Sequence, residues 1–199
     1  MSAKLASRNE NKLRELAQAL EGWELGLLDA DDYPPEEGQT YYENARGKAE
    51  HGRAVAAGSS DWVIGEDSGI EVDGLGGRPG VRAARFGGDD PVGRLLDALR
   101  GIEGEGRAAR YVCELVALAP TGEELRGTGI FEGRIAHEPR GSEGFGYDPI
   151  FVPAGEQQTV AELGDDWKRA NSHRARAARA LAEAVAAVSR GLTPGHGPR

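Results

Sequence analysis

The stretch RYVCELVALAPTGEELRGTGIFEGRIAH, residues 110–137, decides the fold. Residues 110–118 form an almost continuous apolar run, which is typical of a buried strand. Residues 124–137 have the pattern of a second strand, and PTGEE at 120–124 supplies the turn between the two. The middle of the chain is therefore predicted to be a β-hairpin.

Strands alternate with helices on both sides of this hairpin, which predicts an α/β domain with a mixed sheet. Before it we expect strands at about 3–6, within 25–39 and at 62–69, helices at about 10–21, 40–57 and 90–100, and a turn-rich segment at 69–88. After it we expect a short helix at 157–163 and a final helix at 172–189, capped by Asn171 or Ser172.

Length and composition limit the class of protein. The 199 residues suit one domain, at roughly 100–200 residues per domain. We expect that domain over residues 1–190, followed by a disordered Gly- and Pro-rich tail at 191–199. The single cysteine, Cys113, cannot form an internal disulfide and is expected to be a buried thiol.

The net charge of −9 favours a small phosphate ligand over a nucleic acid polymer, because a duplex-binding protein needs a basic face. The N-terminal residues lack the apolar core of a signal peptide, and no apolar run approaches the ~20 residues of a membrane span. A cytoplasmic location is the expectation.

A polar loop precedes the first predicted helix. Ser7, Asn9 and Lys12 can form an anion seat with the free N–H groups of the first turn. The alternative is that Ser7 and Asn9, or Asn11, only cap the helix.

Two acidic segments are candidates for chemistry. EDSG at 66–69 ends the predicted buried strand, and its adjacent carboxylates Glu66 and Asp67 can share a divalent ion while one acts on a water. An ordinary turn is the alternative. Glu36 and Glu37 belong to an acidic loop, and Lys48 lies on the following helix. The alternative to a functional role is that this helix only exposes a charged face to solvent.

Two later segments can bind a base. In GSEGFGYDPIF, residues 141–151, glycines flank Phe145, and such a ring either stacks on a base or plugs a hydrophobic loop. In KRANSHR, residues 168–174, cations lie at the start of the last helix, against the helix dipole. An anionic or keto-bearing ligand explains that placement; otherwise the cations face water.

In combination and order, these motifs resemble the inosine triphosphate pyrophosphatase family over about residues 3–189. The motifs are SxNxxK, GxTxxENAxxKA at 38–49, EDSGIEVDGLGGRPGVRAARF, GFGYDPIF and KxxxSHR. The resemblance implies a long mixed sheet flanked by helices, two lobes around a central cleft, and a homodimer. It also implies Mg²⁺-dependent hydrolysis of ITP, dITP or XTP to a monophosphate and pyrophosphate. The net charge and the lack of a long apolar run predict neither a nucleic acid polymer nor a membrane as a partner.

The resemblance also implies residue roles. Asp67 matches the metal-linked proton acceptor, and Glu37 (or Glu36) and Glu66 match metal-site acids, although many bacterial members have Asp at the position of Glu66. Triphosphate contacts are expected at Ser7, Asn9, Lys12, Lys48 and Ser68, with Arg85 as a further contact. Arg8 stands where many members have Gly, and it either contacts phosphate or points outward. Base contacts fall on Phe145, Gly146, Tyr147, Asp148, Lys168, His173 and Arg174.

Two other functions are consistent with parts of this pattern. A pyrophosphatase for other modified nucleotides would share the phosphate loop but lack the SHR motif, which this chain has. A non-catalytic nucleotide-binding module would be expected to lose Asp67, which is retained.

Overall fold

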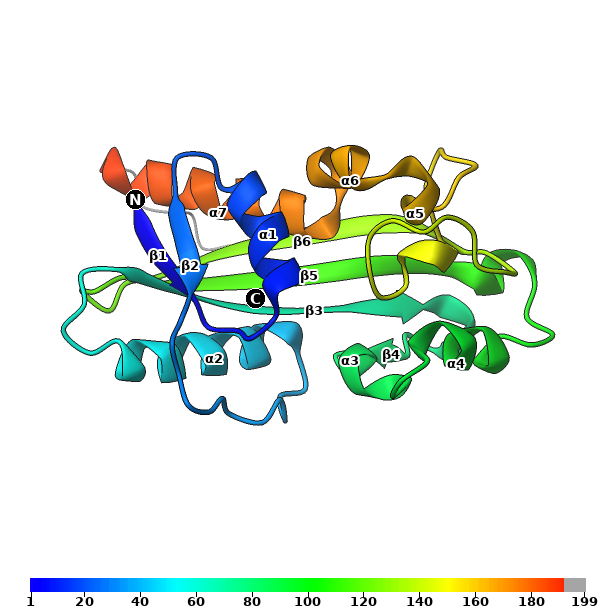
Figure 1. Cartoon of the computed structure of the whole chain (residues 1–199), viewed down its shortest axis with the longest axis horizontal. Helices are drawn as coiled ribbons and strands as arrows, with labels where there is room; N and C mark the ends of the chain where they lie inside the picture. Colours follow the sequence, from blue (N-terminus) through cyan, green and yellow to red (C-terminus); the bar gives the residue numbers. More distant parts are fainter. Residues whose placement is uncertain (192–199) are drawn as a thin grey trace.

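The computed structural model describes residues 1–191 and has a mixed sheet between two layers of helices (Figure 1). The strands are β1 (Ser2–Leu5), β2 (Glu24–Leu27), β3 (Trp62–Val72), β4 (Pro79–Gly80), β5 (Ala108–Leu118), β6 (Glu124–Ile135) and β7 (Phe151–Pro153). The α-helices are α1 (Glu10–Ala19), α2 (Tyr41–Val55), α3 (Ala83–Phe86), α4 (Pro91–Ala98), α5 (Val160–Leu163), α6 (Asp165–Asn171) and α7 (His173–Ser189). Three 3₁₀ turns lie at Asp73–Leu75, Gly104–Arg107 and Asp148–Ile150.

The predicted hairpin is the centre of the sheet. The strand order is β2-β1-β3-β5-β6-β7, with β4 paired to β3. Strands β5 and β6 pair antiparallel from Ala108 opposite Arg134 to Leu118 opposite Glu124, while β1 runs parallel to both β2 and β3. The expected α/β class with a mixed sheet is therefore confirmed.

Helices cover both faces of the sheet. Helix α2 packs on β3 and β5, and α7 packs on β6 and β5, with α1 against α7. In Figure 1, α6 and α7 lie above the sheet and α2, α3 and α4 below it. Burial follows this arrangement: β5 is buried along most of its length, whereas β6 alternates between buried and exposed residues.

Local capping sets where the functional helices begin. The side chain of Asn9 accepts from the N–H groups of Asn11 and Lys12 at the start of α1. Thr40 forms a capping box with Glu43 at the start of α2. Of the two predicted caps for the last helix, Ser172 is the one that caps α7.

Two glycines let helices approach the sheet closely. A Cβ at Gly65 of β3 would lie 1.9 Å from the carbonyl oxygen of Ala45 in α2. A Cβ at Gly129 of β6 would lie 2.0 Å from the carbonyl oxygen of His173 in α7. Because no other residue fits such contacts, these glycines set how closely α2 approaches β3 and α7 approaches β6.

The structure corrects two expectations about secondary structure. EDSG does not end its strand: β3 continues to Val72, because β5 keeps pairing with it up to Ala109. Lys168 lies in a separate helix, α6, which the sequence pattern did not predict.

The hydrophobic core has two main clusters. One lies between the sheet and α1 and α7 and includes Leu5, Leu16 and Leu181. The other includes Ile70, Leu99 and Phe151, toward the opposite end of β3. No helix within residues 1–191 is long and apolar enough to cross a membrane. The predicted disordered tail lies outside the described residues, apart from Gly191.

Candidate active site

The site begins where β1 ends beside the middle of β3. The last residue of β1, Leu5, pairs with Ile64, and the N–H of Ala6 donates to the carbonyl of Ile64. Beyond this point β1 no longer covers the edge of β3, and the chain turns into the loop before α1. The polar loop predicted as an anion seat is thereby placed beside Glu66 and Asp67.

The carboxylates of Glu66 and Asp67 point to opposite faces of the sheet, because successive side chains of a strand alternate. Glu66 meets Lys12 of α1 and Arg174 of α7, whereas Asp67 meets Asn44 and Lys48 of α2. The expectation that the adjacent carboxylates share one ion therefore does not fit this backbone. Both are nevertheless buried, at 1% and 3% exposed.

Asp67 forms the α2 side of the site. Its Oδ2 accepts from Asn44 Nδ2 at 2.9 Å, and its Oδ1 lies 3.4 Å from Lys48 Nζ. Burial raises the pKa of Asp67, against the lowering effect of Lys48 and Asn44. Lys48 also donates to the carbonyl of Glu66 at 2.9 Å and pairs with Glu36. Although burial opposes its charge, these carboxylates raise the pKa of Lys48.

Of the two loop acids, Glu36 is the one that reaches this side of the site. It pairs with Lys48, whereas Glu37 is exposed. Within residues 1–191, no group of three or more His, Cys, Asp and Glu side chains is arranged to hold a metal ion. The oxygen donors gathered here are two carboxylates, Glu36 and Asp67, and the carbonyl of Glu66, all around Lys48 Nζ.

Glu66 starts a chain of alternating charges on the other face. Its Oε2 lies 2.5 Å from Lys12 Nζ, and its Oε1 accepts from Arg174 Nε at 3.0 Å and from the thiol of the buried Cys113 at 3.7 Å. Burial alone would raise the pKa of Glu66, but Lys12 and Arg174 together hold it well below its usual range.

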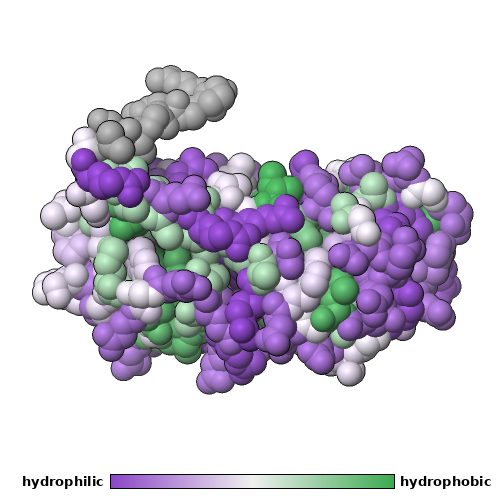
Figure 2. Space-filling model, turned by 90° about the horizontal axis from the view of Figure 1, so that it is seen from above, coloured by the Kyte–Doolittle hydropathy of each residue, from purple (hydrophilic) through white to green (hydrophobic). Residues whose placement is uncertain are grey.

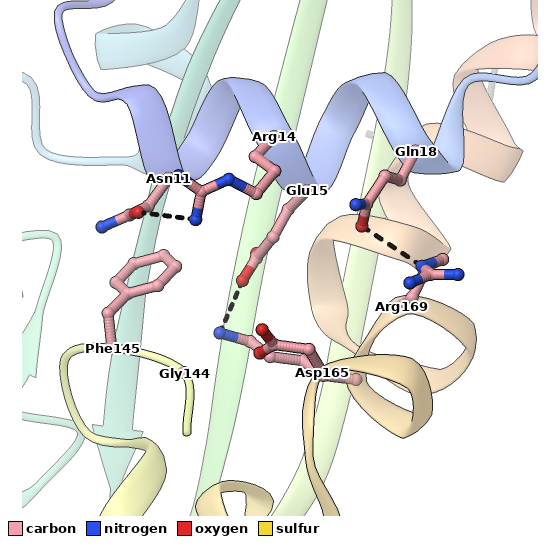
Figure 3. A pocket seen from close by; sticks show the side chains of 9 residues that line it. Asn11, Arg14, Glu15, Gln18, Gly144, Phe145, Asp165 and Arg169 are labelled. Atoms are coloured by element: carbon pink, nitrogen blue, oxygen red, sulfur yellow. Dashed lines mark hydrogen bonds and ion pairs between the residues drawn. The ribbon is translucent and has the colours of Figure 1, made fainter. Parts of the chain in front are cut away.

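Glu15 of α1 continues this chain and was missed by the sequence analysis. It pairs with Arg174 Nη1 at 3.0 Å and with Lys168 Nζ at 2.5 Å, and Lys168 pairs in turn with Asp148 at 2.5 Å. Figure 3 shows Glu15 projecting from α1 on the same side of the helix as Asn11, which lies above the ring of Phe145. Its position three residues after Lys12 on one helix was the signal available in the sequence.

Asp148 and Tyr147 anchor the loop that contains Phe145. Asp148 Oδ2 accepts from the N–H of Phe145 at 2.8 Å, and Tyr147 is anchored by a hydrogen bond from its hydroxyl to the carbonyl of Ala83 at 3.1 Å. Lys168 Nζ lies over the half-buried ring of Phe145, 4.1 Å from the ring centroid. Burial raises the pKa of Tyr147 to about 12 and also raises that of Asp148, against the effect of Lys168. The neighbouring Gly146 has a φ of +64°, which favours glycine.

Two adjoining cavities meet at Asn9 and Lys12. The first, of about 300 Å³, is lined by residues that include Ser68, Tyr111, Phe145, Asp148, Lys168, His173 and Arg174. The second, of about 860 Å³, is lined by residues that include Ser7, Arg8, Glu36, Lys48 and Arg85. The first cavity thus holds aromatic rings and buried polar groups, and the second holds several cations.

The remaining predicted residues have other partners. Ser7 Oγ accepts from the N–H of Asn9 at 3.1 Å, and Ser68 Oγ accepts from Arg174 Nη2 at 2.8 Å. Arg85 donates to the carbonyl of Glu36 at 2.5 Å. Arg8 is exposed; its guanidinium contacts the carbonyl of Asp31 and lies 5.5 Å from the ring centroid of Tyr33.

Comparisons with known proteins agree with this arrangement. A model of the Ham1 family matches residues 4–184. The dITP/XTP pyrophosphatase of Bdellovibrio bacteriovorus is 40% identical over 196 residues, covering 93% of this chain and 98% of that protein. The dITP/XTP pyrophosphatase of Bacillus subtilis is 41% identical over 193 residues, covering 92% and 96%.

A solved structure shows the same fold. The Ham1 protein of Staphylococcus aureus superposes with a TM-score of 0.80 at 30% identity, covering 94% of this chain and all of that one. The family match includes every residue that lines the two cavities. The chain belongs to the Ham1 family.

Proposed function

We infer that this protein hydrolyses non-standard purine nucleoside triphosphates, such as dITP, ITP and XTP, to the monophosphate and pyrophosphate. The observation that carries this inference is the pair of adjoining cavities, one suited to a base and the other to a triphosphate. Curated relatives about 40% identical over most of the chain are named dITP/XTP pyrophosphatases.

The triphosphate is proposed to bind across the start of α1. Lys12 and Lys48 bring positive charge from opposite faces of β3. The positive end of the α1 dipole lies beside them, although the N–H groups of Asn11 and Lys12 already donate to the side chain of Asn9. Ser7, Asn9, Ser68 and Arg85 add polar contacts around the same cavities. Arg8 is a weaker candidate, because its guanidinium is engaged with the loop at Asp31 and Tyr33.

Asp67 is proposed to accept the proton of the attacking water. Its burial raises its pKa, which makes it a better base, while Lys48 and Asn44 hold its carboxylate in place. Attack at the α phosphorus breaks the bond to the β-phosphate oxygen, so that pyrophosphate leaves. Phosphoryl transfer depends mainly on such positioning and on neutralisation of charge.

A divalent cation, Mg²⁺ by resemblance, fits the α2 side of the site. Glu36 and Asp67 are the two carboxylates on that side and share the single cation Lys48, whereas Glu66 lies on the other face between Lys12 and Arg174. When bound, the ion would neutralise phosphate charge and polarise the scissile bond. Glu37, which is exposed, fits this role less well than Glu36.

The base is proposed to lie in the smaller cavity. The ring of Phe145 offers a stacking surface, and the loop of Gly146, Tyr147 and Asp148 holds it there. Donors from Lys168, His173 and Arg174 favour O6 of hypoxanthine or xanthine over the amino group of adenine. Three nitrogens of Arg174 already bond Glu66, Glu15 and Ser68, so Arg174 must offer a remaining N–H to the base.

A panel of nucleoside triphosphates with Mg²⁺, scored for pyrophosphate against orthophosphate, tests this function. We expect pyrophosphate from dITP, ITP and XTP and slow turnover of ATP and GTP. Release of orthophosphate, or preference for a pyrimidine or methylated nucleotide, would support a related pyrophosphatase instead. Binding without turnover of any nucleotide would indicate a non-catalytic module.

A homodimer and a single two-lobed domain over residues 1–190 are proposed by resemblance, and a cytoplasmic location is proposed with them. Figure 2 shows hydrophilic residues over much of the face seen from above, with smaller hydrophobic patches between them. Light scattering across a range of protein concentrations would test the dimer, and a stable mass of one chain would contradict it.

A further inference from the structure

Tyr111 and His173 lie face to face in the wall of the smaller cavity. Their ring centroids are 4.5 Å apart and their planes differ by 4°, which is a parallel stack. Tyr111 projects from β5 and His173 from the first turn of α7, so two separate elements meet in this contact. Both residues line the cavity assigned to the base.

Within residues 1–191, no hydrogen bond fixes the ring of His173. The side chain is 3% exposed, and its Nδ1 is buried without a partner among the described residues. A functional histidine is usually oriented by a hydrogen bond to its second ring nitrogen. Burial also lowers the pKa of His173 well below its usual value, so the ring is neutral and has one donor and one acceptor nitrogen.

Tyr111 is itself firmly held. It is 7% exposed, its ring packs on Phe151 at 4.7 Å between centroids, and its hydroxyl lies 3.5 Å from Asp148 Oδ1. Gly129, opposite Cys113 on the neighbouring strand, allows the backbone of His173 to approach the sheet closely enough for the rings to meet. The plane of the imidazole is thus set by a ring on a central strand.

We propose that Tyr111 is a positioning residue for base recognition: its ring, stacked on His173, fixes the plane in which the imidazole presents its nitrogens to the base. The proposal rests on the base-contacting role proposed above for His173. It assigns the function to the aromatic face of Tyr111 and not to its hydroxyl, whose contact with Asp148 is at the limit of a hydrogen bond.

The test compares kcat/KM for ITP with kcat/KM for ATP in three variants. Tyr111→Leu removes the aromatic face, and the ratio should fall roughly five- to tenfold, as for one lost neutral hydrogen bond. The fall should come mainly from a higher KM for ITP, because the base is remote from the reacting phosphorus. Tyr111→Phe keeps the stack and should retain the wild-type ratio.

Phe131→Leu is the matched control. Phe131 pairs with Tyr111 across the strands, is similarly buried at 4% exposed, and packs on Phe151 and Trp167. It should lose similar stability without a change in the ratio. If Tyr111→Leu does not fold, Tyr111→Met fills the space without an aromatic face and takes its place.

An unchanged ratio in the folded Leu or Met variant would overturn the proposal. So would an equal fall in Phe131→Leu, or a loss in Tyr111→Phe as large as that in Tyr111→Leu. His173→Ala separates this inference from the proposed function: an unchanged ratio there means that His173 does not read the base. A fall in His173→Ala without one in Tyr111→Leu rejects only the role of Tyr111.

Discussion

Glu66 and Asp67 are consecutive residues of β3, yet their carboxylates meet different cations on opposite faces of the sheet. Glu66 contacts Lys12 and Arg174, and Asp67 contacts Lys48. Because side chains alternate along a strand, these two acids are adjacent in sequence but lie on opposite faces of the sheet and have different partners. The separation leads to two predictions that concern these residues directly.

Asp67→Asn should abolish turnover while nucleotide binding remains detectable. Asparagine keeps the shape and can still accept from Asn44, but it cannot take a proton from water. We expect kcat to fall by roughly a hundredfold or more, the usual contribution of a general base. Steady-state kinetics at saturating Mg²⁺, with calorimetry for ITP binding, measure both quantities; near wild-type turnover would reject the assignment.

Glu66→Gln should leave the Mg²⁺ dependence of hydrolysis unchanged, because Glu66 faces away from the carboxylates of Asp67 and Glu36. Glu36→Gln is the matched comparison and should raise the half-saturating Mg²⁺ concentration by about tenfold or more, since loss of even an outer-shell partner of a metal ligand typically costs that much affinity. Initial rates across a Mg²⁺ titration decide the point. A rise in the Glu66 variant equal to that in the Glu36 variant would make Glu66 a metal ligand after all.

Phe145→Ala should raise KM for ITP without a comparable loss of affinity for inorganic tripolyphosphate. The ring lines the cavity assigned to the base, and stacking on a base typically contributes ~1–3 kcal/mol. We therefore expect KM to rise by roughly tenfold. Kinetics and calorimetry on the same variant test this, and equal losses for both ligands would mean that the ring only supports the loop.

The stability of the protein should fall with acid in a way that depends on His173. The pKa of this histidine is lowered in the folded state, so the unfolded state binds a proton more readily below about pH 6.5. Stability from this group is complete above pH 6.5 and is lost as the pH falls toward the folded-state pKa. Between pH 7 and 5.5 the wild type should lose roughly 1 kcal/mol more than His173→Gln.

Urea unfolding of both proteins at the two pH values measures this difference. Parallel losses in the two proteins would show that His173 titrates normally in the folded state.

Gly65→Ala should severely destabilise the protein, because the new Cβ would lie 1.9 Å from the carbonyl oxygen of Ala45. Relief requires α2 to move away from β3, and we expect a cost of about 3 kcal/mol or more. Gly47→Ala on the exposed side of α2 is the control: its Cβ meets nothing within 4 Å, and the substitution should be neutral or stabilising. Equal thermal midpoints for the two variants would contradict the close packing.

Local sequence determined the elements of this protein to a large extent. The apolar run at 110–118, the turn at 120–124 and the strand pattern at 124–137 identified the hairpin. Short polar motifs marked the starts of α1, α4 and α7. Such features depend on residues within one or two turns of each other, so they can be read without the fold. The motifs also identified the family, because their order along the chain is a property of the sequence.

Only the tertiary structure decided how the site is assembled. Glu15 joins Lys168 and Arg174 across more than 150 positions of sequence, and Tyr111 stacks on a histidine from another element. The length of β3 was likewise set by its pairing with β5, which overrode the turn-like composition of EDSG. Charge pairing and ring stacking depend on distance in space, and the packing of α1, α2 and α7 on the sheet determines that distance.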